Sequence, residues 1–105
     1  MNSVICEAIR KKAVLRFTYE GHPRIVEPQT HGISTAGKEV LRAVQTGGSS
    51  ESAMTAFGKL FEMAKMSNIE ETGETFSGPG AGFNPRDKGM RLIHCHLRLV
   101  EKNDA

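Results

Sequence analysis

Two lysines bracket an apolar pair in the second half of the chain, and this pattern suits an anionic ligand. Lys59 and Lys65 are six residues apart, so a regular strand would place both on one face with Phe61 and Met63. Two such cations could hold phosphate while a base stacks on the ring. Alternatively, Phe61 and Met63 are core residues, and both lysines extend from the strand ends into water.

Two histidines, His94 and His96, alternate in the last apolar segment, so a strand would project both imidazoles to one side. This spacing can chelate a transition metal, but a third ligand would have to come from His22, His31 or a carboxylate. Since two ligands seldom hold a metal, we expect two solvent-exposed histidines and no metal or other cofactor.

The two cysteines, Cys6 and Cys95, form no Cys-x-x-Cys pair, so their spacing argues against a structural zinc site and a thioredoxin-like motif. No secretory signal is recognisable, so we expect reduced, buried thiols in a cytoplasmic protein; a bridge would require oxidising conditions. Buried thiols are inert, and no Gly-x-Ser-x-Gly motif is present. The sequence therefore predicts a protein that is not an enzyme.

Length and composition indicate one small globular domain. The chain has 105 residues, of which 38% are hydrophobic and 25% charged, and we expect a domain over 1–100 and a disordered tail over 101–105. Lys and Arg number 14 against 12 Asp and Glu, without a block of like charges, which excludes a basic DNA-gripping arm. No apolar run is long enough to span a bilayer, so no membrane contact is expected.

Periodicity predicts one helix followed mainly by strands. Apolar residues recur at helical spacing at the N-terminus and alternate in four later segments. The region 53–66 fits a helix or a strand, and this choice stays open. A Gly/Ser-rich loop and a long Gly/Pro-rich loop are also expected. The expected elements are a helix over 3–12, strands over 14–19, 24–27, 39–45 and 90–100, and loops over 46–52 and 73–89.

Several of these segments, in order, resemble the WYL domain family. The segments are 7–10 with 15–21, 24–28, 37–43 and 59–66. Only Leu41 remains of the Trp-Tyr-Leu motif, since Glu39 and Val40 replace the aromatic residues, and Lys59 and Lys65 replace arginines. The helix-turn-helix that usually precedes this domain is not expected here. The resemblance favours a strand over 59–66.

The resemblance implies a mainly β fold with one N-terminal helix, closed into a small SH3/Sm-like antiparallel β-barrel. It also implies a ligand-sensing or nucleic-acid-binding regulatory role through a basic groove, with single-stranded nucleic acid or a nucleotide as partner. Lysine in place of arginine weakens bidentate phosphate binding. The alternative is a protein-interaction or homodimerisation module without an anionic ligand. The residues expected to form the groove are Arg42, Lys59 and Lys65, with Arg16, Tyr19 and Arg24 as further candidates.

Overall fold

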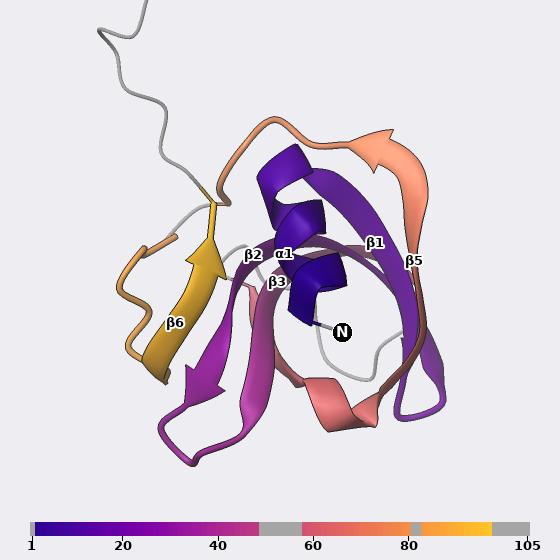
Figure 1. Ribbon diagram of the computed structural model, residues 1–105. Helices are drawn as coiled ribbons and strands as arrows, with labels where there is room; N and C mark the ends of the chain where they lie inside the picture. Colours follow the sequence, from indigo (N-terminus) through magenta and orange to yellow (C-terminus); the bar gives the residue numbers. More distant parts are fainter. Residues whose placement is uncertain (1, 49–57, 81–82, 98–105) are drawn as a thin grey trace, which may run out of the picture.

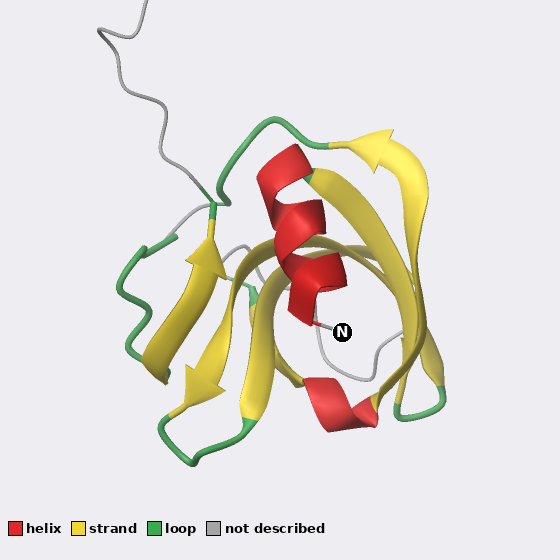
Figure 2. Cartoon of the chain, viewed as in Figure 1, coloured by secondary structure: helices red, strands yellow, loops and turns green. Residues whose placement is uncertain are grey.

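The structure is a computed structural model that describes residues 2–48, 58–80 and 83–97. It is mainly β with one N-terminal helix and an antiparallel sheet, as predicted (Figure 2). In the described part, no helix is both long and apolar enough to cross a membrane. In chain order the elements are α1 (Asn2–Lys11), β1 (Ala13–Tyr19), β2 (His22–Ser34), β3 (Glu39–Gly48), β4 (Lys59–Glu62), the 3-10 turn η1 (Met63–Lys65), β5 (Met66–Thr75) and β6 (Met90–His96).

Helix α1 packs through one apolar face. Ile5, Ala8 and Ile9 are buried, whereas Val4 is 48% exposed, so the buried stripe is narrow. The helix ends where Lys12 adopts a positive φ of 57° and donates its backbone N–H to the carbonyl of Ile9. This turn leads directly into β1, so α1 lies across the opening of the curved sheet (Figure 1).

Strand β2 organises the sheet because it has different partners along its two halves. Its first half pairs with β1, from Tyr19 opposite His22 to Leu15 opposite Val26. Its second half pairs on the same side with β6, whereas β3 follows its other edge throughout. Between the two halves lies Gln29, whose carbonyl accepts the N–H of Leu97 and whose side-chain oxygen accepts the N–H of Gly80.

The prediction that the second strand stops at Pro28 is wrong. β2 continues to Ser34, and a register shift separates Pro28 from Thr30 in the ladder with β3. Proline lacks the N–H that a regular ladder needs, but an irregularity of this kind removes the requirement.

The strand β1 has the predicted alternation. Leu15, Phe17 and Tyr19 are buried, whereas Arg16 is exposed. The rings of Phe17, Tyr19 and Phe61 meet edge to face, with centroids 4.9 to 6.4 Å apart. Such pairs add to the stability given by the buried apolar area.

The sequence leaves open whether 53–66 is a helix or a strand. The part that the structure describes, from residue 58, contains β4 and the turn η1, which precede β5. Strand β5 differs from the prediction, because its alternation is weak and seven of its ten residues are exposed. The expected loops are shorter than predicted, since 46–48 belong to β3 and 73–75 to β5. Strand β6 ends at His96. The expectations for 49–57 and for the tail 101–105 lie outside the described residues.

The described strands form an open path. The order is β4-β3-β2-β1-β5, with β6 paired to β2, and β4 and β5 are not paired with each other along it. The sheet curves strongly (Figure 1), yet the predicted closed barrel is not confirmed. Helix α1 contacts both β2 and β6 where these two strands pair, and this region is called the corner below.

Candidate functional site

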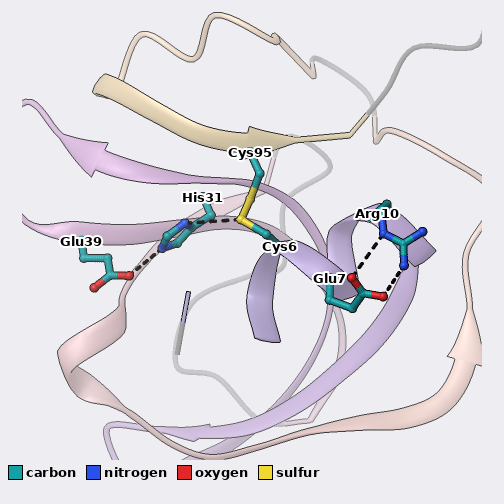
Figure 3. The surroundings of a disulfide bond; sticks show 6 residues. All are labelled: Cys6, Glu7, Arg10, His31, Glu39 and Cys95. Atoms are coloured by element: carbon teal, nitrogen blue, oxygen red, sulfur yellow. Dashed lines mark hydrogen bonds and ion pairs between the residues drawn. A yellow bond between two sulfur atoms is a disulfide. The ribbon is translucent and has the colours of Figure 1, made fainter. Parts of the chain in front are cut away.

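Cys6 and Cys95 form a disulfide between α1 and β6, with Cα atoms 5.9 Å apart (Figure 3). The prediction of two reduced, buried thiols is therefore wrong, and both residues are only half-buried. The physical reason is that the second half of β2 holds β6 beside α1, a pairing that the spacing of 89 residues does not reveal.

His31 lies next to this disulfide on β2 and is completely buried. Its Nδ1 is 4.0 Å from Sγ of Cys6, and its Nε2 is 2.7 Å from Oε2 of Glu39. Glu39 stands opposite Ile33, two residues from His31 along β2, and this diagonal position lets its side chain reach the imidazole. Figure 3 shows the carboxylate, imidazole and sulfur in a row.

The close approach of β2 and β6 at this corner depends on Gly32. A Cβ atom built there would lie 2.1 Å from the backbone oxygen of Leu92. Any other residue would push β6 away from β2, and Cys95 would move away from Cys6.

Burial lowers the pKa of His31 below its ordinary value of 6.5. Glu39 acts in the opposite direction but does not outweigh the loss of solvation, and His94 contributes a smaller lowering effect. The imidazole is therefore neutral at neutral pH. Because a carboxylate only accepts hydrogen bonds, Nε2 donates to Glu39, and the lone pair of Nδ1 faces the sulfur.

The two histidines of β6, His94 and His96, are both solvent-exposed, as predicted. The ring of His94 stacks on His31 with centroids 5.1 Å apart, whereas Nδ1 of His96 donates to the carbonyl of Leu97 at 2.6 Å. Among the described residues, the group with metal-ligand geometry is instead Cys6, His31 and Cys95, whose ligand atoms all lie within 4.8 Å of one another. His31 had been considered only as a third ligand.

Close to the disulfide, α1 also carries an exposed ion pair between Glu7 and Arg10 (Figure 3). Its hydrogen bond lowers the pKa of Glu7 and raises that of Arg10. The pair balances the charge on the helix surface beside Cys6.

An open hollow of about 230 Å³ lies beside Glu39, where η1 meets the start of β3. Its lining residues are Lys38, Glu39, Glu62, Met63 and Ala64. Glu39 thus connects the surface to the buried imidazole, and its side chain is 35% exposed.

Three of the predicted basic-groove residues are ion-paired. Arg42 on β3 makes two hydrogen bonds to Asp87, at 2.8 and 3.0 Å, and these lower the pKa of the Asp87 carboxyl. Arg16 on β1 pairs with Glu70 at 2.9 Å. Lys65 in η1 lies 3.5 Å from both Glu20 and Glu62.

Lys59 and Arg42 belong to neighbouring strands but to opposite faces of the sheet. Lys59 stands opposite Ala43, and Arg42 stands opposite Leu60, so strand alternation separates the two cations. The sequence interpretation that Lys59 and Lys65 share one strand face does not hold, because η1 interrupts the strand after Glu62.

Tyr19 and Arg24 are the two predicted residues that the structure brings together, and they meet inside the molecule. Arg24 is only 5% exposed and lies over the rings of Tyr19 and Phe61, at 5.5 and 5.9 Å. The hydroxyl of Tyr19 accepts the backbone N–H of Glu62 at 3.0 Å. These contacts give both residues a structural role, and the basic groove stays a prediction.

Comparison with known proteins gives no relative from which a role could be transferred: no family model, no curated protein and no solved structure matches the chain. The assignment of the candidate site therefore rests on the geometry described above.

Proposed function

We propose that this protein is a non-catalytic regulatory module controlled by reversible opening of the Cys6–Cys95 disulfide. The observation that carries the proposal is the fully buried His31, which faces Cys6 with one ring nitrogen and Glu39 with the other. A purely structural bridge needs no imidazole beside it, and burying a polar ring has a cost that its hydrogen bonds must offset.

The cluster fits the chemistry of thiol–disulfide exchange. Two equivalents of a small thiol reduce the bridge to two protein thiols and become a disulfide themselves. In the reduced protein, Nδ1 of the neutral His31 acts as a general base that takes the proton of the Cys6 thiol while the thiol reacts, and Glu39 stabilises the imidazolium that forms transiently. To close the bridge again, an oxidised small disulfide first exchanges with the Cys95 thiol, which forms a mixed disulfide and releases one small thiol. The Cys6 thiolate then attacks the Cys95 sulfur and releases the second small thiol.

Opening the bridge removes the covalent connection between α1 and β6. The helix is then held by the apolar contacts of Ile5, Ala8 and Ile9. A change in how α1 covers the sheet is the signal that we propose a partner detects.

We propose a cytoplasmic location. Because thiols there are normally reduced, formation or opening of the bridge would report a change in redox conditions. Our proposal also includes a WYL-like protein with an SH3/Sm-like barrel, and this part rests on the resemblance of the sequence segments to that family. The partner, whether an anionic ligand or a second copy of the chain, remains part of this proposal.

The test is the rate at which iodoacetamide alkylates Cys6 in the reduced protein at neutral pH, followed by peptide mapping. We expect Glu39→Gln to slow alkylation by about tenfold, because one charge-assisted hydrogen bond contributes ~1.5 kcal/mol. The matched control is Glu70→Gln, which removes a carboxylate that pairs with Arg16 away from the cluster. Equal rates in wild type and Glu39→Gln would contradict the proposal.

A further inference from the structure

We propose that the reduced protein binds a zinc ion through Sγ of Cys6, Sγ of Cys95 and Nδ1 of His31. This inference deepens the proposed function and rests on it, since the sulfurs become ligands only after the disulfide opens. The three ligand atoms come from α1, β6 and β2, and all lie within 4.8 Å of one another.

The distances are close to those of a tetrahedral zinc site. Typical Zn–S and Zn–N bonds place two sulfurs about 3.8 Å apart and a sulfur and a nitrogen about 3.6 Å apart. Nδ1 of His31 is already 4.0 Å from Sγ of Cys6, so the imidazole needs little movement. The two sulfurs must separate, and a rotation of one cysteine side chain allows this while the backbone stays in place.

The second ring nitrogen of His31 is arranged as in a metal site. Metal-bound histidines usually donate their other N–H to a carboxylate, which fixes the ring and the tautomer. Glu39 accepts that hydrogen bond at 2.7 Å. The disulfide alone explains why the two sulfurs are adjacent, but it does not explain why a buried imidazole is oriented toward them.

The chemical balance requires a reductant and releases protons. A dithiol reductant gives two hydrogens to the bridge and becomes a cyclic disulfide, which leaves two cysteine thiols. Zinc then displaces both thiol protons, since the thiolate is the ligand, and accepts the lone pair of His31. Two thiolates and one imidazole form a donor set that zinc prefers.

Three protein ligands leave one tetrahedral position for water. Cys6 and Cys95 are half-buried, so solvent reaches their side of the cluster, whereas His31 closes the other side. A site with one such position takes an additional donor atom from a small molecule or from a partner protein.

The experiment is titration of the full-length reduced protein with Co²⁺ under anaerobic conditions, followed by displacement with Zn²⁺. Free thiols are counted in the same sample before metal is added. We expect one equivalent of cobalt, with the strong visible bands of a tetrahedral site and a sulfur-to-cobalt charge-transfer band. Cys95→Ser and His31→Gln should lose this spectrum. Glu39→Gln should keep it and bind about 10-fold to 100-fold more weakly.

The matched control is His96→Ala, which removes an exposed imidazole of the same strand and should leave the spectrum unchanged. Two free thiols without a cobalt spectrum would overturn the zinc site and leave the redox switch standing. A bridge that resists the dithiol would overturn both. A spectrum that survives Cys95→Ser but disappears in His96→Ala would place the metal on the exposed histidines and overturn the proposal.

Discussion

Two regions of this molecule are held together in different ways. The interior between β1 and β4 consists of aromatic rings in edge-to-face contact, with Arg24 stacked over two of them. The corner between α1, β2 and β6 depends on one disulfide and on the polar contacts of His31. Packed apolar side chains are not changed by reductant or by pH. A disulfide, in contrast, is opened by reductant, and a histidine titrates with pH. The comparison thus separates a part of the fold that reductant and pH leave unchanged from a part that responds to both.

The largest effect is expected in the aromatic interior. Phe17→Ala should lower the free energy of unfolding by ~3–5 kcal/mol, because it leaves a cavity beside the rings of Tyr19 and Phe61. Urea denaturation measures this loss. Leu92→Ala is the control, since Leu92 is 52% exposed and its truncation should change stability by less than about 0.5 kcal/mol. A loss below ~1 kcal/mol for Phe17→Ala would show that the interior does not determine stability.

The next effect is expected at the corner. Replacing both cysteines by serine should cost ~2–4 kcal/mol, because the bridge joins positions 89 residues apart and restricts the unfolded chain. Wild type in excess dithiol should lose the same amount, and the variant should not respond to dithiol. Near-ultraviolet circular dichroism of the aromatic interior should stay native-like in both. Loss of that signal would mean that the two regions are not independent.

A smaller effect concerns pH. Since burial lowers the pKa of His31, the unfolded chain takes up a proton near pH 6.5 that the folded protein does not. The stability from a neutral His31 is therefore complete above that pH and decreases as the pH falls below it, by at most about 1.4 kcal/mol per pH unit. Denaturation from about pH 8 to about pH 5 measures the slope, and His31→Gln should reduce it. An unchanged slope in that variant would remove His31 as the pH-sensitive group.

The smallest effect on stability is expected for the predicted basic groove. Lys59→Glu combined with Lys65→Glu should change the free energy of unfolding by less than about 1 kcal/mol, because surface ion pairs contribute little. The same variant tests the anionic ligand. Binding of a labelled single-stranded oligonucleotide to wild type should weaken as salt rises, and the variant should not bind. Salt-independent binding, or equal binding by the variant, would contradict the groove and leave the disulfide corner as the candidate site.

The sequence predicted the regular elements well where alternation is strong. β1 and β3 carry buried residues at every second position, and the helical spacing of Ile5, Ala8 and Ile9 is equally plain. β5 could not be predicted in the same way, since seven of its ten residues are exposed and only Met66 is buried, so no regular apolar face distinguishes it from a loop.

The candidate site was largely missed, because its residues are remote in sequence. Cys6, His31 and Cys95 become neighbours only because β6 pairs with the second half of β2 and α1 packs against both strands. The one local signal was the pair His31-Gly32, where a glycine marks a close backbone approach beside a histidine. The basic residues were easier to find by charge but do not share a face.

The Cys6–Cys95 bond closes almost the whole chain into a covalent ring, since its two ends are 89 residues apart. A protease that cuts one peptide bond inside this ring leaves a nicked protein whose pieces stay attached. The nicked form should run as one band on a denaturing gel without reductant and as two bands with it. A cut in the backbone therefore releases a fragment only when the surroundings become reducing enough to open the disulfide.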